Sequence, residues 1–253
     1  MMPDIVYCGP VIAEFGWEVM TIQPYFRAAS EPFDKVYVCS FPGMEFLYAD
    51  FCDVFLTHRH PGRALKWWDE EAMAKVEYEI PAGVTFHMKP VRQYRNDGRL
   101  FIPYGTKDPI STYNYIIHAR NIQKGSVKNY NYDCWQEVVK MLDGNIASVG
   151  KYPDRHIPGT DDLRGVDGDV LVRYMAGARC VIGGSSGVMH LATLCNAPIV
   201  TWGDSRTYFY ETLEKRYTET WNPFRSPVKF IFSDNWQPGP DVVVEAVDKI
   251  RKP

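Results

Sequence analysis

The sequence has no long hydrophobic run and no excess of positive charge. Its apolar stretches fall short of the roughly 18 residues that a membrane-spanning helix needs, and no basic segment precedes an apolar one near the N-terminus. We therefore expect neither a membrane span nor a secretory signal. The 28 Lys and Arg residues against 31 Asp and Glu give a net charge of −3, which provides no global field for nucleic acid or for an anionic membrane. Nucleic acid is thus a disfavoured partner.

The sequence also lacks CxxC pairs, internal repeats and low-complexity tracts. Its six cysteines lie apart, several of them inside apolar runs, and the histidines show no zinc-ligand spacing with them. We expect reduced, buried thiols, a cytoplasmic location and no metal cofactor.

What the sequence does have is the composition of a soluble globular protein. Hydrophobic residues make up 45% and charged residues 23% of the 253 residues, a length that suits one large domain or two of ordinary size. Short apolar runs bounded by Gly and Pro alternate with segments of helical periodicity. The runs expected to be strands are 5–8, 35–40, 53–57, 115–118, 146–149, 180–182 and 197–202. The segments expected to be helices are 17–29, 65–76, 134–141, 170–176, 188–194 and 241–251.

Alternating strands and helices predict an α/β fold with parallel sheets covered by helices on both faces. We predict two Rossmann-like halves that face a cleft. The Pro-rich stretch 80–113 is expected to be irregular and to contain the boundary. The predicted domains are a first Rossmann-like half at 1–110, a second Rossmann-like half at 111–240 and a C-terminal helix at 241–253 that packs back on the first half.

The loop Gly183-Gly184-Ser185-Ser186-Gly187 lies between a predicted strand and a predicted helix. Such a loop offers backbone N–H groups, two hydroxyls and the positive end of a helix, which together bind a phosphate or a carboxylate. An alternative is a tight turn in which Ser185 or Ser186 caps the helix. The loop matches neither the ATPase P-loop pattern nor the full dinucleotide fingerprint.

Several cationic residues are expected beside this loop. His190 lies one helical turn beyond Gly187, although a lone helical histidine is often a packing residue. His118 and Arg120 follow a strand of the same half, with Lys124 and Lys128 after them. Ligands bind at the carboxyl ends of strands in open parallel sheets, so these side chains and the serine loop should converge on one crevice. The guanidinium of Arg120 can make a bidentate contact with a diphosphate, and a lysine can neutralise the charge of the diphosphate without a metal ion.

Two carboxylates, Glu14 and Glu18, occupy the first strand-to-helix turn of the other half. Either could remove the proton of an acceptor hydroxyl. Glu18 could instead simply favour the N-terminus of its helix.

The segment from Cys180 to Gly203 resembles the donor site of GT-B glycosyltransferases. It is most similar to the ADP-heptose:lipopolysaccharide heptosyltransferase family (glycosyltransferase family 9), which carries an Asp-Thr-Gly-x-x-His-Leu-Ala pattern. The matching residues are Ser186, Gly187, His190, Leu191 and Ala192. Ser185 stands where that family usually has aspartate.

Two further stretches share this resemblance. Phe15-Gly16-Trp17-Glu18, followed by Thr21 and Pro24, resembles the family's Leu-Gly-Asp stretch, which places its aspartate base on Glu18 with Glu14 as a close rival. His118-Ala119-Arg120 resembles the His-x-Arg of GDP-fucose-using fucosyltransferases.

The resemblance implies a glycosyltransferase that moves a sugar from a nucleotide-diphospho-sugar to a hydroxyl of a glycan or lipid-linked sugar, without metal and with inversion. It implies that the half at 1–110 presents the acceptor and the half at 111–240 holds the nucleotide-sugar donor, with Glu18 or Glu14 as base. Arg120, Lys128, Ser185, Ser186, Gly187 and His190 would bind the diphosphate, with His118 and Lys124 as further candidates. The alternatives are a GT-B-like transferase of another group, such as pyruvyl, and a non-catalytic sugar- or nucleotide-binding protein.

Overall fold

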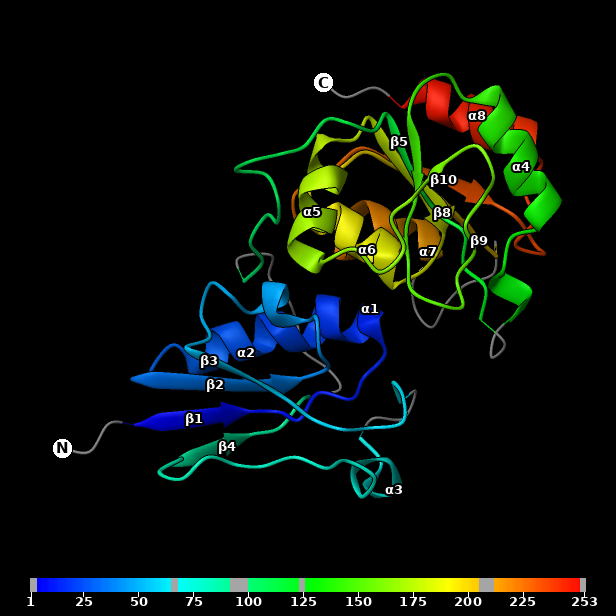
Figure 1. Cartoon of the computed structure of the whole chain (residues 1–253). Helices are drawn as coiled ribbons and strands as arrows, with labels where there is room; N and C mark the ends of the chain where they lie inside the picture. Colours follow the sequence, from blue (N-terminus) through cyan, green and yellow to red (C-terminus); the bar gives the residue numbers. More distant parts are fainter. Residues whose placement is uncertain (1–3, 65–67, 92–99, 123–125, 205–211, 251–253) are drawn as a thin grey trace. The chain divides into compact units, whose positions relative to one another are not determined.

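The computed structural model describes residues 4–64, 68–91, 100–122, 126–204 and 212–250. Contacts divide the chain into two compact units, Met1–Phe101 and Ile102–Pro253 (Figure 1). The predicted boundary at 110 falls inside the second unit, where the N–H of Ile110 donates to the carbonyl of Arg173. Each unit is described by itself below.

The first unit is a four-stranded parallel sheet in the order β3-β2-β1-β4. Its strands are β1 (Ile5–Cys8), β2 (Lys35–Ser40), β3 (Val54–Thr57) and β4 (Phe86–Met88). The segment after β1 forms a continuous helical run of α1 (Phe15–Trp17), the π-helical turn η1 (Glu18–Ile22) and α2 (Gln23–Ser30). Shorter helices are η2 (Glu45–Leu47) and α3 (Glu70–Met73). Val19, Ile22 and Phe26 recur at helical spacing and are fully buried, which fixes the face that this run turns to the core.

The second unit is a six-stranded parallel sheet in the order β10-β9-β8-β5-β6-β7. Its strands are β5 (Tyr115–His118), β6 (Ile146–Ser148), β7 (Asp161–Asp162), β8 (Cys180–Gly184), β9 (Ile199–Gly203) and β10 (Val228–Phe232). Its helices are η3 (Ser126–Lys128), α4 (Tyr132–Met141), α5 (Gly168–Gly177), α6 (Gly187–Leu194), α7 (Leu213–Lys215), η4 (Arg216–Thr220) and α8 (Pro240–Lys249). Figure 1 shows α4 and α8 on one face of this sheet and α5, α6 and α7 on the other. This is the doubly wound Rossmann arrangement.

The C-terminal helix packs within its own unit. Val243, Ala246 and Val247 of α8 belong to one buried cluster with Trp135 of α4 and Trp202 of β9. We expected residues 241–253 to pack on the first half; the apolar face of α8 instead covers the second sheet.

The predicted two-sheet α/β architecture is confirmed, with differences at single elements. The helix expected at 65–76 is formed only over Glu70–Met73 among its described residues, and α7, η4, β7 and β10 were not predicted. No helix in the described ranges is long and apolar enough to cross a bilayer.

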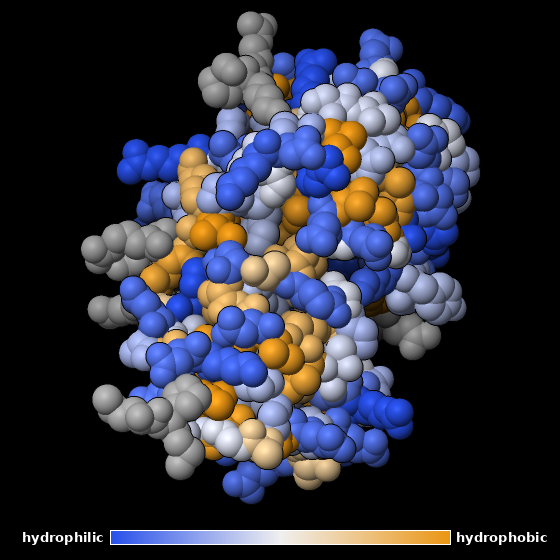
Figure 2. Space-filling view, turned by 60° about the vertical axis from the view of Figure 1, so that its left-hand side comes forward, coloured by the Kyte–Doolittle hydropathy of each residue, from blue (hydrophilic) through white to orange (hydrophobic). Residues whose placement is uncertain are grey.

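Exposed large apolar side chains are spread along both units. Polar and apolar residues alternate in patches over the face shown in Figure 2. The exposed large apolar residues are Trp68, Ile80, Phe86, Val127, Met141, Tyr152, Phe232 and Val242. Because they come from many elements, they are ordinary surface residues of a globular protein.

Candidate functional site

The strand order of the second unit reverses between β5 and β8, and open parallel sheets bind ligands at the carboxyl edge of such a point. His118 is the last residue of β5 and pairs in register with Gly183 of β8. Ser185 and Ser186 follow β8, and α6 begins at Gly187. Strand order therefore brings together residues that lie about 70 positions apart in the sequence.

Ser186 is the N-cap residue of α6, but its side chain makes no capping hydrogen bond. Its Oγ lies 3.0 Å from Nδ1 of His118. The simple capping role that we considered for Ser186 is therefore absent. Because the hydroxyl points away from the helix, it leaves the N–H groups of the first turn of α6 to another acceptor.

His118 links Ser186 to Asp154 in a chain of three side chains. Its Nε2 lies 3.2 Å from Oδ2 of Asp154, and His118 is only 5% exposed. Asp154 also accepts the N–H groups of Asn121 (3.0 Å) and Lys151 (3.2 Å). Burial alone would raise the pKa of Asp154, but the hydrogen bonds from His118 and these two amides outweigh it and lower that pKa. Asp154 is thus an ionised partner for the imidazole.

Tyr217, in the π-helical turn η4, makes two hydrogen bonds to the serine loop (Gly183–Gly187). Its hydroxyl donates to Oγ of Ser185 (3.0 Å) and accepts the N–H of Ser186 (3.2 Å). The N–H of Ser185 donates to the carbonyl of Trp202 (2.9 Å). Two of the loop's amides are therefore engaged in the protein, and burial raises the pKa of Tyr217 so that it stays a neutral phenol.

His190 packs among aromatic rings. It stacks on Tyr217 with ring centroids 5.1 Å apart and meets Trp221 edge-on at 4.5 Å. Burial, helped by the charges of Lys128 and Arg216, lowers the pKa of His190 to about 3. Its Nδ1 is buried and has no hydrogen-bond partner among the described residues. A neutral His190 positions the loop and adds no positive charge.

The burial of His190 gives a testable pH dependence. Below about pH 6.5 the unfolded chain protonates this imidazole, whereas the folded chain does so only near pH 3, so stability falls as pH decreases across this window. We expect His190→Phe to reduce the slope of unfolding free energy against pH by about 1.4 kcal/mol per pH unit between pH 6 and 4. Urea unfolding of both proteins checks this, and equal slopes would contradict it.

Two of the predicted cationic residues lie next to the switch point, which is the carboxyl edge between β5 and β8 where the strand order reverses. The N–H of Arg120 donates to the carbonyl of His118 (3.0 Å), and the Arg120 side chain is half-buried. Nζ of Lys128 lies 4.8 Å from the Trp236 ring centroid, and a Cβ at Gly184 would lie 3.6 Å from the Lys128 carbonyl oxygen. Lys124 lies outside the described residues.

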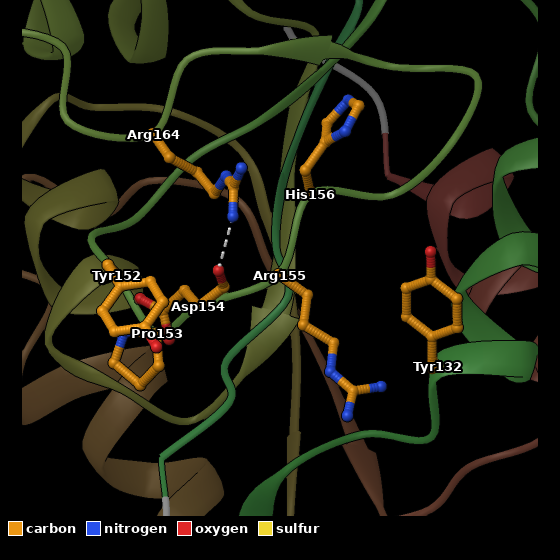
Figure 3. A pocket seen from close by; sticks show the side chains of 7 residues that line it. All are labelled: Tyr132, Tyr152, Pro153, Asp154, Arg155, His156 and Arg164. Atoms are coloured by element: carbon orange, nitrogen blue, oxygen red, sulfur yellow. Dashed lines mark hydrogen bonds between the residues drawn. The ribbon is translucent and has the colours of Figure 1, made fainter.

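A pocket of about 380 Å³ opens beside Asp154 (Figure 3). Its lining consists of Tyr132, Tyr152, Pro153, Asp154, Arg155, His156 and Arg164. Arg164 donates from Nη1 to the carbonyl of Asp154 (2.9 Å), drawn as the dashed line, and the guanidinium carbon of Arg155 lies 5.1 Å from the Tyr132 ring centroid. Asp154 therefore contributes to the pocket and to the contact with His118.

In the first unit, Glu18 is fully buried and its carboxylate is fully engaged. It accepts hydrogen bonds from Ser40 Oγ (2.5 Å) and Tyr48 Oη (2.8 Å) on one oxygen and from Arg63 Nη1 (2.5 Å) on the other. The guanidinium carbon of Arg63 also lies 4.6 Å from the ring centroid of Phe41. These contacts suit a structural role for Glu18, in which its carboxylate fixes the position of the Arg63 side chain.

Glu14 differs from Glu18 in exposure. It directly precedes α1, its side chain is exposed, and it makes no capping hydrogen bond. Its carbonyl accepts the N–H groups of Trp17 and Glu18, which fixes the backbone at the carboxyl edge of the first sheet. Of the two carboxylates, Glu14 is the one that solvent reaches.

Asp154, Tyr217 and Arg63 were missed from the sequence. The sequence feature that accompanies Asp154 is the glycine four residues before it. Gly150 has φ +131°, and a Cβ there would lie 2.5 Å from Oδ2 of Asp154, so this position requires glycine. Tyr217 and Arg63 lie in segments without clear periodicity, and only tertiary contacts identify them.

No protein-family model and no curated protein sequence matches the chain. Solved structures do match. E. coli ADP-heptose LPS heptosyltransferase II has a TM-score of 0.57 at 14% identity, with 97% of each chain covered. A family 9 glycosyl transferase from Veillonella parvula has a TM-score of 0.59 at 12% identity, covering 98% of this chain and 96% of that one.

A third match is the E. coli heptosyltransferase WaaC with ADP, at a TM-score of 0.56 and 11% identity, covering 97% of this chain and 99% of that one. All three extend over both units. Together with the two parallel sheets described above, they show that the chain has the fold of the GT-B heptosyltransferases.

Proposed function

We propose that this protein is a glycosyltransferase that moves a sugar from a nucleotide-diphospho-sugar to a hydroxyl acceptor, such as a glycan or a lipid-linked sugar. The observation that carries the proposal is the second unit's switch point, where His118, Ser186 and the N-terminus of α6 meet at the edge at which Rossmann sheets bind nucleotides. The fold shared with heptosyltransferases, one of them with ADP, supports it.

In this proposal the diphosphate binds at the first turn of α6. The amides of Gly187 and Val188 lie at the positive end of that helix and have no intrahelical acceptor. Arg120 and Lys128 would neutralise the charge that develops on the leaving diphosphate, which requires no metal ion. His190 and Tyr217 hold the loop in place.

The nucleoside would occupy the pocket beside Asp154. This pocket is formed largely by the segment after β6, the strand next to β5, so it adjoins the diphosphate along the same sheet edge. The exposed ring of Tyr152 and the stacked pair of Arg155 and Tyr132 offer flat surfaces for a base.

The acceptor hydroxyl would lose its proton to Glu14. Its oxygen forms the bond to the anomeric carbon as the bond from that carbon to the diphosphate oxygen breaks, and the leaving nucleoside diphosphate takes the electron pair. Such a single displacement inverts the anomeric carbon. Glu14 is exposed and Glu18 is not, so we assign the base to Glu14 and the positioning of Arg63 to Glu18.

The proposed location of the protein is the cytoplasm. Its six cysteines are free thiols, which fits the reducing conditions of that compartment.

Thermal stability against ADP, GDP, UDP, CDP and their sugar conjugates, in EDTA and in magnesium, tests the donor site. A ligand at about 100 times its dissociation constant stabilises the fold by roughly 2.7 kcal/mol. We expect one nucleoside diphosphate and its conjugates to raise the melting temperature equally in both conditions. The absence of any shift would contradict a nucleotide donor.

A further inference from the structure

The pocket beside Asp154 contains two arginines, which differ in what their guanidinium groups contact. Arg164 uses all three of its nitrogens: Nε and Nη2 donate to the carboxylate of Asp162 (2.8 and 2.7 Å), and Nη1 donates to the carbonyl of Asp154 (2.9 Å). Arg155 is exposed, and its guanidinium makes no hydrogen bond or ion pair with any residue that the structure describes. Its five N–H donors are therefore available to a ligand in the pocket.

Arg155 is nevertheless held in place. Its N–H donates to the carbonyl of Ala119 (2.9 Å), and its guanidinium carbon lies over the ring of Tyr132, 5.1 Å from the centroid. Tyr132 is the first residue of α4, whose N-cap Asn131 accepts the N–H of Asp133 (2.8 Å). A guanidinium that stacks on a ring keeps its N–H groups in its own plane, so the contact with Tyr132 leaves the donors of Arg155 open.

Tyr152 offers a face on which a base can rest. Its large aromatic side chain lines the pocket and is 95% exposed. Stacking on an aromatic ring is favourable for every base, because each base has a π-face, so Tyr152 provides affinity without selecting a base. In the view of Figure 3, Arg155 lies between Tyr152 and Tyr132. A base stacked on Tyr152 can turn one edge toward the donors of Arg155.

The edges of the common bases differ in what they offer a guanidinium. Guanine has two adjacent acceptors, N7 and O6, which match two N–H groups of Arg155. Adenine has the acceptor N7 beside the donor N6–H₂, which would face an N–H group. The corresponding edge of uracil has the single acceptor O4, and that of cytosine has the donor N4–H₂. A guanidinium with free donors therefore selects guanine.

We propose that the donor is a guanosine-diphospho-sugar, with its base stacked on Tyr152 and its N7 and O6 bound by the guanidinium of Arg155. The inference rests on the proposed function, in which this pocket holds the nucleoside, and it names the base of that nucleoside. Arg155 is then a specificity-determining residue that does not touch the reacting atoms.

Isothermal titration calorimetry with nucleoside diphosphates in EDTA tests the base. GDP should bind about 5- to 150-fold more tightly than ADP, UDP or CDP, the discrimination expected from one bidentate contact between arginine and a base. Two analogues locate the contact on the base. IDP keeps N7 and O6 and should bind like GDP, whereas 7-deaza-GDP lacks the N7 acceptor and should bind about two- to tenfold more weakly, as for one lost hydrogen bond.

Two variants separate selection of the base from general affinity. Arg155→Lys keeps the positive charge but loses the planar set of donors, so GDP should lose its advantage over both ADP and 7-deaza-GDP. Tyr152→Ala should weaken every nucleotide by a similar factor and keep the preference for GDP, because stacking does not select. Both side chains are exposed, so both variants should melt close to the wild type.

Lys151→Gln is the matched control, because it removes an exposed positive charge from the same segment. It should retain the full preference for GDP. Tighter binding of another base, or a preference for GDP that survives in Arg155→Lys, would overturn this inference and leave the donor site in place. Failure of every nucleoside diphosphate to bind would overturn the proposed function and this inference with it.

Discussion

Glu14→Gln is expected to lower kcat by about 10²- to 10⁴-fold, the usual contribution of a positioned general base. The glutamine keeps the size and polarity of the side chain but cannot accept the proton of the acceptor hydroxyl. Because Glu14 is exposed and does not cap α1, the fold should be unaffected. Steady-state kinetics with the donor found by the stability screen measure the change.

Donor affinity provides the check on this result. Glu14 belongs to the first unit, whereas every proposed donor contact belongs to the second, so calorimetric binding of the nucleotide sugar should match the wild type. Glu31→Gln, at another exposed glutamate of the first unit, should leave kcat unchanged. Full turnover in Glu14→Gln would remove Glu14 as the base.

Glu18→Leu is expected to destabilise the protein by about 3–5 kcal/mol, as in other cases where one partner of a buried ion pair is removed. The substitution leaves Arg63 without its carboxylate and leaves Ser40 Oγ and Tyr48 Oη without their acceptor. Urea unfolding at pH 7 measures the loss. If Glu18 were instead the accessible base, turnover would fall while stability stayed close to that of the wild type.

A double-mutant cycle isolates the ion pair. Glu18→Leu combined with Arg63→Met removes both charges, so the double variant should be more stable than Glu18→Leu alone. Glu71→Leu, in the exposed pair with Lys75, is the control and should change stability little. A Glu18→Leu protein as stable as the wild type would contradict a structural role for this pair.

Much of the fold could be predicted because its strands are short apolar runs with clear ends. Lys35–Ser40 was predicted with its observed bounds, and the strand, turn and helix around Gly183–Gly187 were recognised from a buried run followed by glycines. β7 has only two residues and no periodicity to detect. The π-helical turn at Glu18–Ile22 depends on packing, since its residues also suit an α-helix.

The site was predictable only in its local part. Ser185, Ser186 and Gly187 are adjacent in sequence, and the rule for parallel sheets correctly placed His118 beside them. Asp154 contacts His118 from 36 residues further along the chain, and Tyr217 contacts the loop from 31 residues beyond Ser186. Such contacts follow from tertiary packing, which periodicity does not encode. The difference in burial between Glu14 and Glu18 likewise needed coordinates.

The most direct test of the central claim is to measure release of nucleoside diphosphate from ADP-, GDP-, UDP- and CDP-sugars incubated with the protein, EDTA and a mixture of glycan and lipid-linked acceptors. Chromatography separates the nucleotides. We predict that one donor is consumed with release of its nucleoside diphosphate, and that Glu14→Gln stops the release while still binding that donor. Absence of nucleoside diphosphate from every donor would contradict a glycosyltransferase.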